Sequence, residues 1–157
     1  MSSKAQIAFT VYGDPVPKGS TVPFPLMKDG KPVLGKGGRP VVVIQNANKN
    51  TKQWQTLVAL ASQEHRPEKL FSEAVVLRLR FFFTRPKSIS VKKRPNHTVK
   101  PDLDKLIRCV GDALKGKIYA EDALIVSIEA TKEYGDPPRV EISVSEVTVP
   151  GQKVLFE

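Results

Sequence analysis

Apolar and polar residues follow two different periods along this chain, and these periods predict its secondary structure. Patterns typical of strands occupy residues 5–12, 41–45, 73–84, 123–133 and 138–149. Apolar residues at helical spacing occupy 49–66 and 102–115. The order of these elements predicts a single α+β domain, in which two main helices pack on one face of a mixed β-sheet.

The expected core follows from the same periods. The first helix is expected to bury Trp54, Leu57, Val58, Leu60 and Ala61, and the second Leu103, Leu106, Ile107, Val110 and Leu114. Cys109 is the only cysteine, so no intrachain disulfide can form, and we expect a small buried residue there. The run Phe81–Phe83 suits either the core or a dimer interface. Arg78 and Arg80 alternate with leucines and should share one sheet face, directed toward solvent or DNA.

Glycine and proline residues mark the loops and turns that connect the predicted helices and strands. Residues 13–40 contain six glycines and six prolines and predict a long basic loop with room for a hairpin. Residues 85–100 predict a second basic loop. The Gly135–Pro137 turn predicts that the last two strands form a hairpin. We place the domain at 1–150 and a C-terminal tail at 151–157.

Composition and charge exclude several classes of protein. The 157 residues include 25 Lys and Arg against 16 Asp and Glu, a formal net charge of +9. No apolar run approaches the ~20 residues that span a membrane, and the N-terminus lacks a secretory signal, so we expect an intracellular, cytoplasmic protein. The two histidines and one cysteine make no zinc motif. The GKGG at 35–38 lacks the Walker A ending, which argues against a nucleotide cofactor.

The distribution of charge points to phosphates. Residues 85–100 contain six Lys and Arg and no acid, and they lead directly into Asp102 and Asp104. A further acidic pair, Glu121-Asp122, follows the second helix. Clustered carboxylates repel a nucleic acid backbone unless a cation stands between them, and oxygen ligands are those that Mg²⁺ prefers. The pattern therefore favours a divalent-metal site that acts on phosphates.

Simpler explanations exist for each acid taken alone. Asp102 suits a helix N-cap, where a free backbone N–H favours a carboxylate by about 0.5–2 kcal/mol. Asp104 and Arg108 have the spacing of an ordinary ion pair. On an ideal helix Asp102 and Asp104 point about 200° apart, so they can converge only if Asp102 lies at the cap, outside helical geometry.

The motif residues resemble a known family. Pro101–Arg108 (PDLDKLIR), then Asp112-Ala-Leu114, then Tyr119–Ala123 are similar to the RusA family of Holliday junction resolvases. The loop Gly13–Gly19 is similar to the opening loop of that family. The resemblance implies an endonuclease that depends on Mg²⁺, with Mn²⁺ as a substitute, and cuts branched, four-way DNA as a homodimer. It is also compatible with a phage or prophage gene.

The resemblance implies roles for individual residues. The family's three catalytic, metal-binding aspartates fall on Asp102, Asp104 and Asp122, and its essential lysine falls on Arg108. Lys105, Glu121 and Leu124 also depart from the family pattern. The residues expected to hold the DNA backbone are Lys18, Lys36, Arg85, Lys92, Lys93, Arg94 and Lys100. The departures keep open a non-catalytic, junction-binding or DNA-binding recombination protein of the same fold; an RNA-binding protein is disfavoured because no RRM signature is present.

Overall fold

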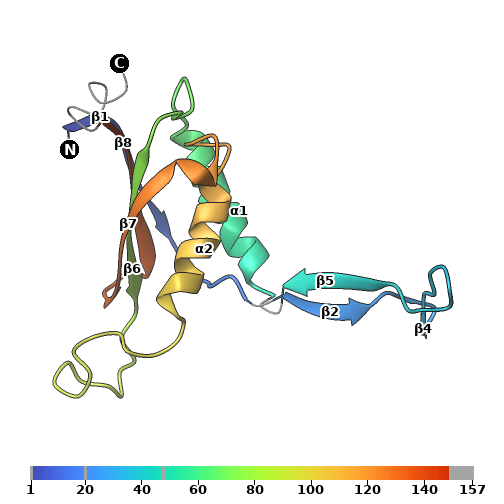
Figure 1. Cartoon of the computed structure of the whole chain (residues 1–157). Coiled ribbons are helices and arrows are strands. Elements are labelled where there is room, and N and C mark those ends of the chain that lie inside the picture. Colours follow the sequence, from blue (N-terminus) through green and yellow to red (C-terminus); the bar gives the residue numbers. More distant parts are fainter. Residues whose placement is uncertain (1, 20, 47–48, 149–157) are drawn as a thin grey trace.

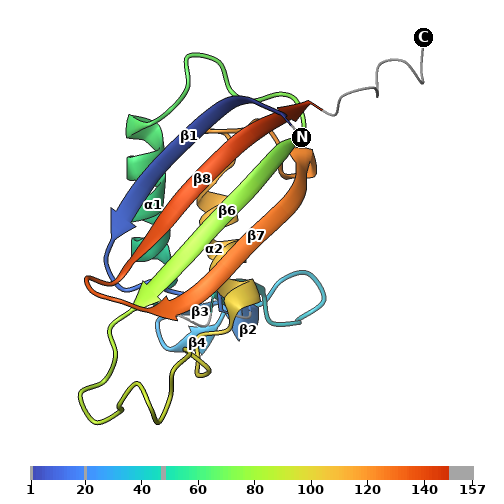
Figure 2. The ribbon, with the colours of Figure 1, turned by 90° about the vertical axis from the view of Figure 1, so that its left-hand side faces the viewer.

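A four-stranded sheet forms the centre of the computed structural model, which describes residues 2–19, 21–46 and 49–148. The strand order is β1 (Ser2–Tyr12), β8 (Arg139–Thr148), β6 (Val75–Phe83) and β7 (Ile125–Tyr134). β8 is antiparallel to both of its neighbours, whereas β6 and β7 are parallel (Figure 2). The predicted mixed sheet is thus confirmed. The predicted tail at 151–157 lies outside the described residues.

Two helices, α1 (Thr51–Glu64) and α2 (Leu103–Leu114), cover one face of this sheet and leave the other open (Figure 1). The core lies between the two layers, where Leu77, Leu79 and Phe81 of β6 meet Leu106 and other apolar side chains of α2. This arrangement confirms the predicted α+β class. Neither helix is long and apolar enough to cross a membrane, within the ranges given above.

The sequence explains why α2 forms and where it ends. Leu106, Val110 and Leu114 recur at four-residue spacing and are fully buried, as the helical stripe predicts. Cys109 is buried beside them, and burial raises the pKa of its thiol to about 12. The helix stops before Gly116, whose positive φ of 74° suits glycine and turns the chain away.

The predicted hairpin of the last two strands is wrong. β6 lies between β7 and β8, so the turn at Gly135–Pro137 spans the end of a third strand. The Gly135 backbone N–H donates to the Phe83 carbonyl at 3.0 Å, which attaches the turn to β6. A Cβ at Gly135 would lie 2.7 Å from the Phe82 ring, so only glycine fits. A turn signal identifies a reversal of direction but not the strand that fills the space between its arms.

Two further expectations need correction. In α1, Trp54 and Val58 are buried as predicted, but Leu57 and Leu60 are exposed on the far side of the helix. The phenylalanine run divides between the two faces of β6: Phe81 is in the core, while Phe82 packs on the open face under the guanidinium of Arg139, 3.9 Å from the ring centroid.

Residues 21–46, most of which belong to the long loop predicted at 13–40, form an arm that extends away from the body (Figure 1). Its base pairs β2 (Thr21–Pro25) with β5 (Val42–Asn46), and its tip pairs β3 (Met27–Lys28) with β4 (Lys31–Pro32). The expected hairpin is therefore present. The arm and the basic loop 85–100 extend from the same end of the body, at which α2 begins (Figures 1 and 2).

Candidate active site

Asp102 stands at the N-cap of α2, with extended backbone angles of φ −72° and ψ 137°. This is the non-helical geometry that lets Asp102 and Asp104 converge. The Asp102 carboxylate makes no capping hydrogen bond within the described chain, and instead pairs with the Lys105 Nζ at 2.9 Å. Capping by the side chain therefore does not explain this residue.

Asp104 and Arg108 lie one turn apart on the exposed side of the same helix. Asp104 is in the first turn, where the helix dipole favours a carboxylate. No ion pair joins these two residues, both of which the structure describes, so the simple i,i+4 explanation is also unsupported. Both side chains are accessible to a substrate that approaches this end of the helix.

The charges around Asp102 keep it ionised. The hydrogen bond from Lys105 lowers the pKa of the Asp102 carboxyl most, followed by the positive charges of Lys105, Lys100 and Lys132. The same partnership raises the pKa of Lys105. At neutral pH the Asp102 carboxylate is thus charged and paired with Lys105, with the further positive charges of Lys100 and Lys132 nearby.

Lys132 holds the segment that leads into α2. It lies on β7 opposite Phe81, and its Nζ donates to the carbonyl oxygens of Val99 at 2.6 Å and Pro101 at 2.9 Å. Sequence reasoning missed this residue. A signal was present, because Lys132 falls at an inward-facing position of an alternating strand, two residues from the partly buried Ala130. A lysine at such a position requires acceptors inside the fold.

Asp122 lies at the opposite end of α2, in the 3-10 turn η1 (Asp122–Leu124) that precedes β7. The lengths of α2 and β7 indicate how far Asp122 lies from Asp102. α2 rises by about 18 Å over its length at 1.5 Å per residue. From Ile125 to Lys132, whose side chain contacts Pro101, β7 extends about 23 Å at 3.3 Å per residue. Asp102 and Asp104 both lie at the N-terminal end of α2, and Asp122 lies apart from them.

The surroundings of Asp122 agree with this placement. Burial, followed by the Asp122 and Asp112 carboxylates, raises the pKa of Tyr119, which is buried near the C-terminal end of α2. Glu121 pairs with Lys115 at 2.9 Å in the same region. Among the described residues, no group of three or more His, Cys, Asp or Glu is arranged to hold a metal ion. A ligand role for Asp122 stays a prediction.

The predicted DNA-binding residues divide into two groups. Arg85 donates to the carbonyls of Ser90, Arg94 and Pro95, and its guanidinium lies 4.0 Å from the Tyr134 ring centroid. Arg94 donates to the Tyr134 hydroxyl at 3.3 Å, and Lys18 pairs with Asp112 at 2.5 Å. The side chains of these three residues make contacts within the fold, and a role for them in DNA binding stays a prediction. The residues exposed to solvent are Lys36, Lys92, Lys93 and Lys100.

His97 anchors the basic loop and was not predicted. Its ring is buried, 4.4 Å from the Phe83 ring and 4.9 Å from the Tyr134 ring between centroids. Its Nδ1 has no hydrogen-bond partner in the described chain. Burial lowers the pKa of His97, and the charges of Lys132 and Arg94 lower it further.

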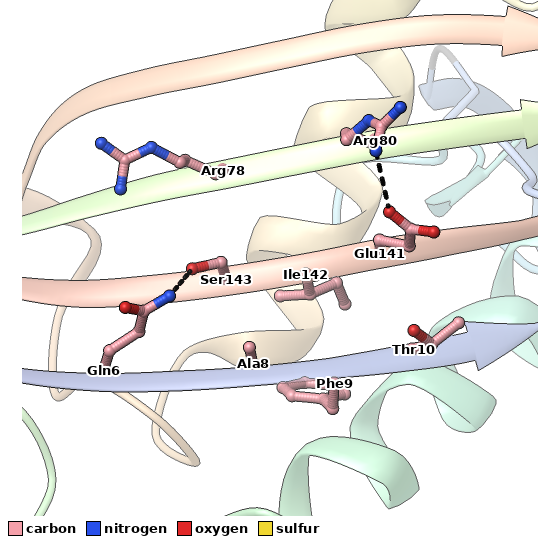
Figure 3. Close-up of a pocket in the computed structure, with 9 residues that line it drawn as sticks. All are labelled: Gln6, Ala8, Phe9, Thr10, Arg78, Arg80, Glu141, Ile142 and Ser143. Atoms are coloured by element: carbon pink, nitrogen blue, oxygen red, sulfur yellow. Dashed lines mark hydrogen bonds and ion pairs between the residues drawn. The ribbon is translucent and has the colours of Figure 1, made fainter.

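A hollow of about 520 Å³ lies on the open sheet face, away from these acids (Figure 3). Its charged side chains are paired, and two of its polar side chains contact each other: Arg80 pairs with Glu141 at 3.4 Å, and Gln6 donates to Ser143 at 3.1 Å (Figure 3). Arg78 pairs with Glu129 at 2.7 Å. These contacts are those of a solvated sheet face, so the acidic end of α2 is the stronger candidate site.

Exposed carboxylates at a helix N-terminus, near a basic loop and a basic arm, form a candidate site for phosphodiesters. Comparison with known proteins identifies the family of this domain. The family model described as endodeoxyribonuclease RusA matches residues 23–145. The chain belongs to the RusA endodeoxyribonuclease family.

Two relatives support this placement. The uncharacterized protein YqaN of Bacillus subtilis (strain 168) is 32% identical over 151 residues, which cover 90% of this chain and 97% of YqaN. The crossover junction endodeoxyribonuclease rusA of Lactococcus phage r1t is 35% identical over 89 residues, which cover 54% of this chain and 65% of the phage protein.

Proposed function

We propose that this protein is a Mg²⁺-dependent, structure-selective endonuclease that resolves four-way DNA junctions by paired nicks in recombination and repair. The observation that carries the proposal is the exposed Asp102–Asp104 pair, held at the end of the body from which two basic segments extend. Membership of an endodeoxyribonuclease family supports the reaction class. The phage relative named as a crossover junction endodeoxyribonuclease supports branched DNA as the substrate.

The donor chemistry of Asp102 and Asp104 fits Mg²⁺, because both supply only oxygen and Mg²⁺ is commonly held by one or two carboxylates, waters and substrate phosphates. Mn²⁺ takes the same ligands. When bound there, the ion would neutralise phosphate charge and make a water molecule more acidic.

Arg108 is proposed to stabilise negative charge that develops on the phosphate. Its guanidinium stays protonated at any working pH, so it can act electrostatically but cannot relay a proton. The exposed residues Lys92, Lys93 and Lys100 are proposed to bind the DNA backbone, which makes binding weaken steeply as salt rises. Lys36 would add a contact from the arm.

A homodimer suits this reaction. A four-way junction has near two-fold symmetry, and its resolution requires two matched nicks, so a C2 pair of identical subunits places one site on each strand to be cut.

The substitution Asp104→Asn tests the proposal. The variant should bind a synthetic four-way junction like wild type in a mobility-shift assay, because binding depends on the basic residues. Its cutting in Mg²⁺ should fall by more than about a hundredfold, the upper limit for loss of a supporting residue. Asp29→Asn, at the exposed tip of the arm, is the matched control. Cutting at the wild-type rate by Asp104→Asn would refute the assignment.

A non-catalytic junction-binding or DNA-binding protein of the same fold is the second candidate. The observation that favours it is Arg108, which stands where the family lysine was expected. The same assay separates the two candidates, because a binding protein shifts the junction and leaves it uncut with or without Mg²⁺.

A further inference from the structure

A cavity of about 460 Å³ opens directly beside Asp102. One wall is the loop Pro15–Pro17, and the other is the segment Lys100–Asp102 that leads into α2. Lys105 lies at its rim, where it pairs with Asp102. The cavity therefore adjoins the place where the scissile phosphate is proposed to bind, and no step of the proposed reaction uses it.

Both walls are fixed in place before any substrate binds. The Lys18 backbone N–H donates to the Lys105 carbonyl at 3.0 Å, which attaches the first wall to α2. The Thr51 hydroxyl donates to the Pro17 carbonyl at 2.8 Å and attaches it to α1. The two hydrogen bonds from Lys132 hold the second wall against β7. A cavity with such supports is preorganised for a ligand.

The chemistry of the walls matches a nucleotide. The inner surface includes Pro15, Val16, Pro17 and Pro101, whose rigid apolar groups suit the face of a base and a deoxyribose. The ammonium groups of Lys100 and Lys105 at the rim suit the flanking phosphates. We propose that this cavity receives one unstacked nucleotide of the DNA substrate, next to the phosphate bound at Asp102 and Asp104. This proposal rests on the proposed nuclease function.

Such a subsite explains how the enzyme distinguishes a junction from plain duplex. Moving a base out of the stack costs a few kcal/mol, and the cost is lowest where stacking is already interrupted. A branch point interrupts stacking, whereas continuous duplex does not. Cutting that requires a nucleotide in this cavity is thus favoured at the branch point and disfavoured elsewhere.

Fluorescence of 2-aminopurine tests occupancy without any cutting. A set of junctions carries the probe at successive positions around the branch point, and emission is measured on binding in metal-free buffer. Wild type should raise the emission at one position, because an unstacked probe is brighter. Val16→Phe, which fills the cavity, should bind the junction but abolish the rise. Leu60→Phe, on the exposed side of α1, is the matched control and should behave like wild type.

A second measurement separates a filled cavity from a damaged fold. Val16→Phe should cut the normal junction about tenfold or more slowly, the size of effect expected when one base loses its contact surface. A junction with an abasic site at the bright position needs no room for a base, so Val16→Phe and wild type should cut it at equal rates. A defect of Val16→Phe that is equally large on the abasic junction would overturn the proposal.

The remaining outcomes are also decisive. If no position brightens with wild type, or if Val16→Phe brightens as much as wild type, the cavity does not receive a nucleotide. If wild type cuts no junction in Mg²⁺, the proposed nuclease function fails, and the metal-free fluorescence still decides whether the cavity holds a base.

Discussion

At the scale of single residues, Lys132 supports the segment that carries Asp102. Its ammonium group carries two hydrogen bonds from the sheet to the segment before α2. Hydrogen bonds to a charged group contribute about 1.5–3 kcal/mol each, enough to hold that segment in one conformation. Because both of these hydrogen bonds go to backbone carbonyls, we propose that Lys132 is a positioning residue and not a catalytic one.

Replacement of Lys132 by methionine keeps most of the stem and removes the donors. We expect Lys132→Met to bind junctions normally, to need more Mg²⁺ for half-maximal cutting, and to cut about 10–100-fold more slowly, as for other supporting residues of metal sites. The measurement is a Mg²⁺ titration of the cutting rate. Lys132→Arg should recover part of the rate because a guanidinium can also reach two carbonyls.

The exposed Lys69→Met variant is the control for loss of a lysine. A purely structural role for Lys132 would lower the melting temperature and leave the Mg²⁺ requirement unchanged. That result would contradict the positioning role.

At the scale of elements, the arginines of the basic loop 85–100 hold its conformation, whereas several of its lysines are exposed to solvent. Arg85 donates to loop carbonyls and lies over the Tyr134 ring, and Arg94 donates to the Tyr134 hydroxyl, so both side chains hold the loop in shape. In the described part of the chain, the side chains of Lys92 and Lys93 make no such contacts and are exposed. One run of like charges thus contains two functions, which composition alone does not separate.

His97 makes the order of this loop depend on pH. Its pKa in the folded protein lies below the ordinary value of 6.5, so the unfolded loop binds more protons between the two pKa values. The stability that the buried ring contributes is complete above about 6.5. It declines as pH falls through the window toward the folded pKa. The charged groups around the ring, Lys132 and Arg94, act in the same direction.

Limited proteolysis measures this dependence. Trypsin should cleave at Lys92 and Lys93 faster at pH 5.5 than at pH 7.5 relative to a His97→Phe protein digested in parallel, which removes the effect of pH on trypsin itself. The phenylalanine keeps the ring stack on Phe83 and cannot be protonated. A wild-type to variant ratio that is constant over this range would show that His97 does not titrate in the loop.

Periodicity predicted the elements well because burial of one face requires it. The α2 stripe at Leu106, Val110 and Leu114 and the alternation of β6 are both direct consequences of core contact. The order of strands was less accessible, since it depends on a pairing between β6 and β8 that no local pattern encodes. The Asp102–Asp104 pair was predictable because both lie in one short segment. The strand pattern indicated that Lys132 needs acceptors inside the fold, but its partners were not predictable, because they lie about 30 residues away in the sequence.

At the scale of the whole molecule, the placement of Asp122 bears on assembly. Within one chain its carboxylate lies at the far end of α2 from Asp102 and Asp104. In the proposed homodimer, Asp122 of the partner subunit can supply the third carboxylate. Each site would then combine residues from both subunits, and neither subunit would cut alone.

Complementation between inactive subunits tests this arrangement. Asp104→Asn and Asp122→Asn subunits, joined as a heterodimer with two different affinity tags, should nick junctions, because one of the two composite sites contains only wild-type residues. The reciprocal heterodimer joins wild type to the double variant and should be inactive, because each composite site then lacks one carboxylate. The assay measures strand nicking on a junction labelled on one strand at a time.

Sites confined to single subunits predict the reverse of both results, so activity in the reciprocal heterodimer together with silence in the first would exclude the composite site. Each homodimer of a single variant serves as the inactive reference.

The position of β8 has a consequence for biosynthesis. This strand is the last of the domain to leave the ribosome, yet it lies inside the sheet and is the only link between β1 and β6 in the described chain. Until it is added, β1 has no partner in the sheet, and β6 exposes one edge. A nascent chain therefore cannot complete the layer on which α2 and its aspartates rest. We therefore expect the fold, and any activity that depends on it, only after β8 has been synthesised.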